Sequence, residues 1–370
     1  MARAPNEHHY PCESCGADLR FAPGETRLVC SHCGHVQDIP RATGRGTARL
    51  VELDLAAALR ADLPDLEVEE HRTLTCPNCG SSIAMDGAIH ASECPFCATP
   101  VVADTGTRRL IKPQGVVPFV LAETEARAAL GRWMRGLWFA PSGLTEYARR
   151  GRKMTGVYAP YWTFDAATQS QYQGQRGDYY YVTESVMVQV KGHSERRQQQ
   201  VRKVRWHRVG GRVARAFDDV LIYAARSLPT RFVDALRPWD LAQLRDYRPD
   251  YLAGFEAEGY TVELRESHYL ARAEMAHVIA TDVRRDIGGD EQRVERIDTE
   301  YSDETFKHVL LPIWTAAYKY RGRSFRFVVN GQTGAVQGER PWSAWKIGFA
   351  LVLAAIVIGV AIYFGQQQQM

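Results

Sequence analysis

The longest uninterrupted apolar stretch of the chain lies near its end, at residues 347–364 (IGFALVLAAIVIGVAIYF), and it contains no charged residue. A helix of this length would span about 27 Å, close to the roughly 30 Å hydrocarbon core of a bilayer. Trp342 and Trp345 precede the stretch, and Tyr363 and Phe364 end it, as aromatic rings do at the two headgroup levels. The pattern therefore predicts a C-terminal transmembrane helix.

Charges around this stretch predict its orientation. Arg340 and Lys346 lie before it, and the tail at 365–370 carries no Lys or Arg. Because positive residues favour the cytoplasmic side, the bulk of the chain is expected in the cytoplasm. The N-terminus (MARAPNEHHY) has no apolar run and predicts no secretory signal. We expect a single-pass, tail-anchored protein of the cytoplasmic membrane, with residues 341–346 as its juxtamembrane segment.

Upstream, the pattern predicts an α+β body at residues 104–340. Apolar positions recur at a helical period in 122–138 and 262–286, which predicts two helices. Shorter segments rich in aromatic and β-branched residues predict strands; they are residues 156–165, 179–190, 201–215, 311–320 and 324–329. Glycines between or within them, Gly174, Gly177 and Gly210-Gly211, are assigned to turns.

The eight cysteines predict two zinc ribbons. They form four Cys-x-x-Cys pairs with fourteen residues between the pairs of each set, and the second set follows the first by 64 residues. The predicted ligands are Cys12, Cys15, Cys30 and Cys33 in residues 1–40, and Cys76, Cys79, Cys94 and Cys97 in residues 71–103. Residues 41–70 between them read as a linker with one short helix. In a chain facing the cytoplasm, such pairs indicate two structural Zn²⁺ ions and not disulfides.

No catalytic set accompanies these sites. Four thiolates fill a tetrahedral zinc shell and leave no position for a substrate. The chain has no P-loop, no H-E-x-x-H, no G-x-S-x-G and no dinucleotide fingerprint. The acidic groups Asp218-Asp219 and 286–290 (DIGGD) could bind a metal but are more typical of solvated loops. We therefore expect a protein without enzymatic activity.

A local basic run is the best candidate for binding a macromolecule. The formal net charge is +3, and two four-thiolate zinc sites of charge −2 each would shift it to −1. Residues 191–215, however, hold nine Lys or Arg against one Glu. Three interpretations stay open: a solvated hairpin face, a contact with anionic lipid, or a contact with nucleic acid. The candidate contact residues are Arg202, Lys203, Arg205, Arg208 and Arg212.

The twin cysteine ribbons resemble a known family when they are taken with two aromatic segments and the terminal apolar stretch. The segments are YAPYWTFDAATQSQYQGQRGDYYY, from residue 158, and FKHVLLPIWTAAYKYRGRSFRFVVNGQTGAVQGERP, from residue 306. The chain resembles the bacterial membrane-anchored proteins labelled TFIIB-type zinc ribbon-containing, some of which carry the label primosomal protein N′ or helicase. The resemblance implies a non-enzymatic membrane protein with phage-shock protein A-like or SPFH-domain partners. A helicase is not expected, because its ATPase motifs are absent.

These observations together predict an α+β protein with two N-terminal ribbons, a β-rich body and one C-terminal transmembrane helix. The expected function is that of a scaffold or recruitment factor in a membrane-stress system. In this hypothesis the paired ribbons recruit a protein partner, and the body holds them. A nucleic-acid-binding zinc-ribbon protein is the alternative, and it depends on the ribbons and the basic run.

Overall fold

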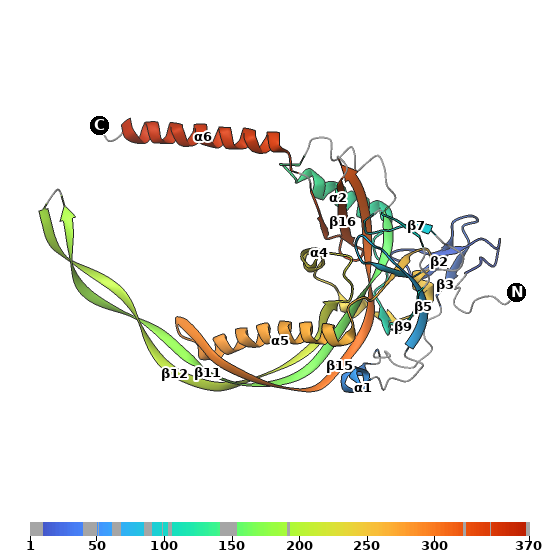
Figure 1. Ribbon diagram of the computed structural model, residues 1–370, viewed down its shortest axis with the longest axis horizontal. Coiled ribbons are helices and arrows are strands. Elements are labelled where there is room, and N and C mark those ends of the chain that lie inside the picture. Colours follow the sequence, from blue (N-terminus) through green and yellow to red (C-terminus); the bar gives the residue numbers. More distant parts are fainter. Residues whose placement is uncertain are drawn as a thin grey trace.

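The structure is a computed structural model of the 370-residue chain. It describes residues 10–39, 50, 52–60, 68–84, 91–97, 99–102, 106–140, 154–190, 193–320, 323–340 and 342–367. A strand-rich body carries a long curved arm and a separate C-terminal helix, and both extend to the same side (Figure 1). The β-rich character of the body, predicted from its aromatic and β-branched segments, is confirmed.

The central sheet is built around two very long strands, β11 (Thr155–Val190) and β15 (Glu291–Tyr320). They pair antiparallel from Thr155 opposite Thr315 to Gly177 opposite Glu291. Shorter strands complete the sheet on either side; they are β4 (Leu53–Asp54), β5 (Val68–Thr75), β6 (Ser82–Ala84), β9 (Gly106–Ile111), β10 (Gly115–Val116), β13 (Arg245–Asp246), β14 (Glu256–Gly259), β16 (Arg323–Asn330) and β17 (Val336–Gly338).

The arm is a hairpin of β11 and β12 (His193–Tyr223), which pair antiparallel from Tyr161 opposite Tyr223 to Val190 opposite His193. Near the body, β15 forms a third strand and helix α5 (Leu264–Ile287) packs along one face. Beyond Gly177, the described part of the arm consists of β11 and β12 alone. Figure 1 shows α5 lying inside the curve of the arm.

An apolar seam joins α5 to the arm. Ile279, Val283 and Ile287 of the helix are buried against Tyr172 and Val213 of the two strands. This spacing of four residues places one stripe of the helix against alternate positions of each strand. The prediction of a helix at 262–286 is confirmed with small shifts in its ends.

The predicted strands all lie within strands of the structure, but the predicted glycine turns are wrong, because β11 and β12 run without interruption through all four glycines. These glycines instead allow close packing. A Cβ at Gly174 would lie 2.5 Å from the carbonyl oxygen of Arg293, and one at Gly211 would lie 2.6 Å from the Tyr172 hydroxyl. Glycine within a strand marks such close approaches as well as turns.

Three shorter α-helices and two 3₁₀ turns lie on or beside the described sheet; they are α1 (Leu55–Leu59), α2 (Glu123–Arg135), α4 (Thr230–Ala235), η2 (Leu241–Gln243) and η3 (Pro249–Leu252). Helix α2 is the one predicted at 122–138. It begins where Glu125 accepts a hydrogen bond from the backbone N–H of Ala122 at 2.8 Å. Its Trp133 ring packs edge-on against Phe327 of β16, which attaches the helix to the sheet.

The C-terminal helix α6 (Ala344–Gln367) leaves the body at Lys346, whose ammonium group donates a hydrogen bond to the carbonyl of Ala140 at 2.8 Å. Among the described residues, no helix is both long enough and apolar enough to cross a membrane. The predicted transmembrane span at 347–364 is contradicted. The tail anchor, membrane partner and membrane localisation derived from it are contradicted with it.

Candidate functional site

The first cysteine cluster is formed by Cys12, Cys15, Cys30 and Cys33, whose sulfur atoms lie within 4.8 Å of one another. The Cys12 and Cys33 sulfurs are 3.5 Å apart, and those of Cys15 and Cys30 are 3.6 Å apart. Tetrahedral zinc with Zn–S bonds of about 2.3 Å places its sulfurs about 3.8 Å apart. The four thiols therefore fit one metal ion of the zinc type, as predicted.

Each described knuckle has the same backbone geometry. The N–H groups of Gly16, Gly34 and Gly80 donate to the carbonyls of Cys12, Cys30 and Cys76 at 2.8 to 3.0 Å. All three glycines have φ near +74°, where other residues are strained. That turn aims backbone N–H groups at sulfur: those of Cys33 and His32 lower the pKa of the Cys30 thiol to about 6. A lowered pKa favours the thiolate that zinc requires.

The second cluster, Cys76, Cys79, Cys94 and Cys97, has the same dimensions. Two sulfur pairs, Cys76 with Cys97 and Cys79 with Cys94, are each 3.6 Å apart. Hydroxyl groups also reach the sulfurs: Ser81 Oγ lies 3.3 Å from Cys94, and Thr99 Oγ1 lies 3.2 Å from Cys97. The neighbouring Cys79 sulfur and then burial raise the pKa of Cys94. A bound cation would relieve this crowding of buried sulfurs.

The first ribbon, whose sheet is β1 (Leu19–Phe21), β2 (Arg27–Cys30) and β3 (Val36–Asp38), packs against the body. Its Phe21 ring contacts Tyr251 and Phe255, with centroids 5.5 and 6.3 Å apart. The Phe21 N–H also donates to the carbonyl of Ala253 at 3.0 Å. This ribbon shares the apolar core of the body.

The second ribbon is joined to the central sheet itself. Its strand β6 pairs with β14, and β14 pairs with β11, so one hydrogen-bonded sheet runs from the ribbon into the arm. Its other hairpin, β7 (Ala91–Glu93) and β8 (Pro100–Val102), lies beside the buried Phe96, which is 1% exposed. The ribbons thus brace the body; the structure does not present them as separate recruitment modules.

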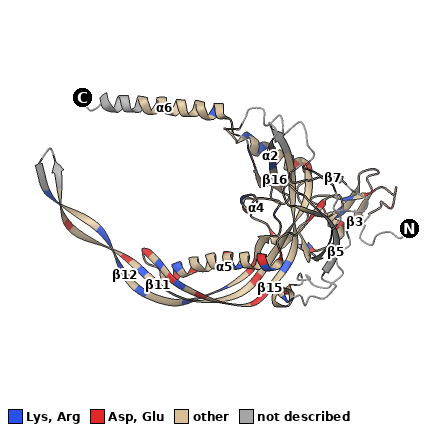
Figure 2. Ribbon diagram, in the orientation of Figure 1, with Lys and Arg blue, Asp and Glu red and all other residues tan. Residues whose placement is uncertain are grey.

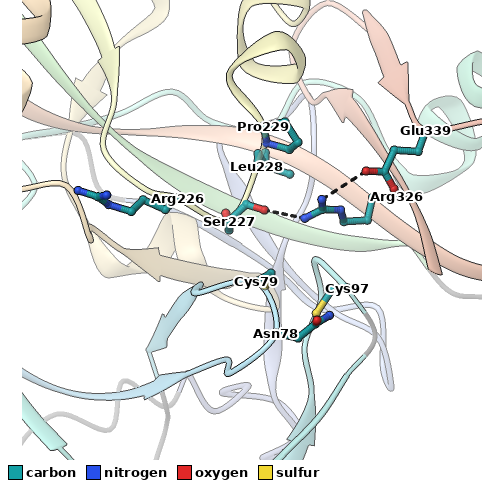
Figure 3. Close-up of a pocket in the computed structure, with 9 residues that line it drawn as sticks. All are labelled: Asn78, Cys79, Cys97, Arg226, Ser227, Leu228, Pro229, Arg326 and Glu339. Atoms are coloured by element: carbon teal, nitrogen blue, oxygen red, sulfur yellow. Dashed lines mark hydrogen bonds and ion pairs between the residues drawn. The ribbon is translucent and has the colours of Figure 1, made fainter. Parts of the chain in front are cut away.

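A polar cavity of about 390 Å³ lies between the second ribbon and the body, lined by Asn78, Cys79, Cys97, Arg226, Ser227, Leu228, Pro229, Arg326 and Glu339 (Figure 3). Its charged groups are paired within the protein. Arg326 donates to the Ser227 carbonyl at 2.9 Å and to Glu339 at 3.3 Å. Arg226 pairs with Glu266 at 2.6 Å. The charged groups of the described cavity walls are therefore engaged in ion pairs and hydrogen bonds within the protein.

Two of the acidic residues considered as metal ligands, Asp219 and Asp286, have other partners. Asp165, Asp218 and Asp219 come together, but the buried ammonium group of Lys307 lies among them, 2.8 Å from Asp219 and 3.3 Å from Asp165. These distances indicate an internal ion-pair cluster centred on a lysine. Near α5, Asp286 accepts a hydrogen bond from the Tyr172 hydroxyl at 2.6 Å and so ties the helix to the arm.

The basic run lies on β12, and the strand register divides it between two faces. Residues directly opposite each other share a face, and successive residues alternate. Tyr172 packs against α5 and lies opposite Gly211, and the register is unbroken from Ala166 to Val190. Odd-numbered residues of β12 therefore face the α5 side, including Lys203 and Arg205. The even-numbered candidates, Arg202, Arg208 and Arg212, lie on the opposite face, so the structure does not bring the five together.

Sequence reasoning missed the partners of these arginines on β11. Glutamines recur at every second position, Gln169, Gln171, Gln173 and Gln175, on the same face as Arg208 and Arg212. This alternation, QSQYQGQ, is the signal that could have identified a polar strand face. Figure 2 shows basic and acidic positions distributed along the arm.

Comparison with known proteins gives one informative relative. The chain is 26% identical over 356 residues to the uncharacterized protein YdjG of Bacillus subtilis (strain 168), covering 91% of each protein. No protein-family model matches the chain, and no solved structure matches it. The clusters support the zinc-ribbon part of the predicted resemblance. The phage-shock protein A-like and SPFH-domain partners are not supported by any of these findings and are dropped.

Proposed function

We propose that this protein is a non-enzymatic zinc-ribbon recruitment factor in which a zinc-braced body holds out the arm as the binding element. Closed four-cysteine sites supply folding energy and no open coordination position. Both ribbons are packed into the body, whereas the arm and helix α6 project from it, and we assign recruitment to the arm. The proposal therefore moves recruitment from the ribbons to the arm.

The observation that carries the proposal is the unsupported end of the arm. Between Asp178 and Val190, β11 pairs with β12 alone, over about 40 Å at 3.3 Å per residue. An isolated two-stranded ribbon is only marginally stable in water. It nevertheless exposes large apolar side chains: Tyr181 is 64% exposed and Met187 is 65% exposed. Such side chains on a projecting ribbon fit contact with another macromolecule.

Shortening the arm tests this function. Asp178 lies directly opposite Arg205, so residues 179–204 can be replaced by Asn-Gly, which closes a two-residue hairpin turn. We expect the shortened protein to keep its zinc and its unfolding midpoint, because the described strands of the removed segment pair with each other and with no strand of either ribbon. It should lose the macromolecules that the full chain captures from a lysate of its source cells.

The control is a variant in which Tyr181 and Met187 are replaced by serine in a full-length arm. It should retain the arm and reduce capture. Recovery of the same partner set by the shortened protein would refute the arm as the binding element.

The alternative function, nucleic-acid binding, gains support from the division of the basic run. Three of the five candidate arginines and lysines share one face with glutamines and aromatic rings.

A further inference from the structure

On one face of the arm, β11 and β12 contribute arginines and no acidic residue, and the acidic residues on that face, such as Asp298 and Glu300, come from β15 near the body. We define the open face as the odd-numbered residues 169–187 of β11 and the even-numbered residues 196–214 of β12, which lie opposite one another in register. Its arginines are Arg196, Arg202, Arg208 and Arg212, and its other residues include six glutamines and three aromatic rings, Tyr179, Tyr181 and Trp206. None of its residues is Asp or Glu.

The charged side chains on the two faces of the arm have different partners. On the α5 side, Lys203 pairs with Glu184 at 2.5 Å, and Arg215 pairs with Asp282. On the open face, Arg202 lies over the Tyr179 ring at 4.2 Å. The exposed Arg208 and Arg212 have no acidic partner among the described residues. On the α5 side the cations are paired with carboxylates. Beside the open face, the described carboxylates of β15 contact Tyr179, Gln175 and Arg296, which leaves the positive charge of Arg208 and Arg212 available.

The shape of this charge indicates the partner. From Arg196 to Arg212 the open face runs about 50 Å at 3.3 Å per residue, as a strip two strands wide. A strip of that length complements a polymer with regularly repeated negative charge better than a local acidic patch does. Arginine forks and glutamine amides donate hydrogen bonds to phosphate oxygens, and exposed tyrosine offers a surface on which a base can stack.

The curvature of the arm favours single-stranded over double-stranded nucleic acid as its partner. Because α5 lies inside the curve, the open face is on the outer side where the helix covers the arm (Figure 1). A duplex has a persistence length of about 50 nm and would touch a convex surface over a short distance. A flexible single strand can follow the curved and twisted ribbon. We infer that the open face of the arm binds single-stranded nucleic acid through its phosphates, with Tyr181 stacking on a base.

This inference rests on the proposed function, since it names the class of partner that the arm recruits. Its test uses the full zinc-loaded chain and a fluorescein-labelled 20-nucleotide single strand, with anisotropy measured over a range of salt concentrations. The paired variants are R202Q/R208Q on the open face and K203Q/R205Q on the α5 side. Both remove two positive charges from neighbouring positions of the same strand, so a difference between them reports the face and not the net charge.

The expected result is an affinity loss of about tenfold for R202Q/R208Q and less than twofold for the control. The slope of log affinity against log salt should become shallower by about 1.4 for R202Q/R208Q, because each single-strand phosphate contact contributes about 0.7. Tyr181→Ala should weaken binding about fivefold without changing that slope, since stacking releases no counterions.

Four results would overturn the inference. Equal weakening by the two double variants would show a general charge effect. Tighter binding of the matching duplex than of the single strand would reject the single-strand assignment. Competition by poly-glutamate as effective as that of the unlabelled oligonucleotide would assign the face to an acidic protein. Failure of oligonucleotide binding, with loss of a captured protein on shortening the arm, would refute this inference and leave the proposed function standing.

Discussion

The buried carboxyl group of Glu258 accepts a hydrogen bond from the Tyr223 hydroxyl at 3.0 Å, at the place where the second ribbon joins the central sheet. Ser227 donates a further hydrogen bond to the same oxygen at 3.1 Å. The other carboxyl oxygen has no partner within the described structure. Glu258 is 3% exposed, and burial raises its pKa to about 8, the hydrogen bonds acting in the opposite direction. The group is therefore mostly protonated at neutral pH.

This pKa predicts that stability falls as pH rises. The ordinary glutamate pKa is 4.5, so between that value and about 8 the folded chain binds the proton that the unfolded chain has lost. Folding stability from this group is greatest below pH 4.5 and declines up to about pH 8, on the order of 1.4 kcal/mol per pH unit. Glu258→Gln, which keeps the shape of the neutral acid, should remove this decline. Thermal unfolding at pH 6.5 and 8.5 measures it, and an unchanged pH dependence in the variant would contradict it.

The zinc ligands could be predicted from the sequence because the pattern is local. Two residues between cysteines, and glycine directly after the second one, define a knuckle whatever surrounds it, as Cys12, Cys15 and Gly16 show. What the ribbons pack against depends on distant residues such as Phe255, and no spacing in the chain records that contact. The ligands were thus predicted and the bracing role of the ribbons was not.

The arm could not be predicted because its signals are ambiguous. Gly174 and Gly177 favour turns in a sequence pattern, whereas here they admit the backbone of Arg293 and the ring of Trp206. The sequence also does not show that the basic run is divided between two faces. That division follows from the register of β11 against β12. Helix α5 could be predicted because its apolar residues recur at a helical spacing over six turns. That spacing is visible without knowledge of the strands on which the helix packs.

Lys307 supplies a prediction about internal charge. Its side chain is 6% exposed, and its ammonium group lies 2.8 to 3.3 Å from the carboxylates of Asp219, Asp165 and Glu52. Lys307→Met would leave three partly buried carboxylates without their cation and should lower the free energy of unfolding by about 2–4 kcal/mol. Lys203→Met, which breaks an exposed pair, should cost below about 1 kcal/mol. Urea unfolding compares the two; equal effects would show that the cluster contributes no more than a surface pair.

Loss of one zinc ion tests whether the second ribbon and the body unfold together, as their shared sheet predicts. Cys94→Ser should reduce the zinc content from two ions to one and lower the unfolding midpoint of the whole body, because β6 and Phe96 belong to the body's sheet and core. Zinc analysis and tryptophan fluorescence, which reports on the buried Trp162, follow the two effects. A ribbon that folds independently would instead lose its metal and leave the fluorescence transition where it is in the unaltered chain.

The contact at Gly174 predicts the cost of a single methyl group in the arm. A Cβ there would lie 2.5 Å from the backbone oxygen of Arg293 and 3.1 Å from the Ile287 side chain, so β11 and β15 would have to separate. Gly174→Ala should therefore destabilise the protein by about 1–3 kcal/mol, as overpacking does. Gly131→Ala is the matched control: in helix α2 its Cβ would meet only the end of the Arg135 side chain at 3.7 Å. There alanine should add up to about 1 kcal/mol of stability through helix propensity. Chemical denaturation of the two variants measures both changes, and a neutral Gly174→Ala would mean that the two strands are not held as closely as this contact requires.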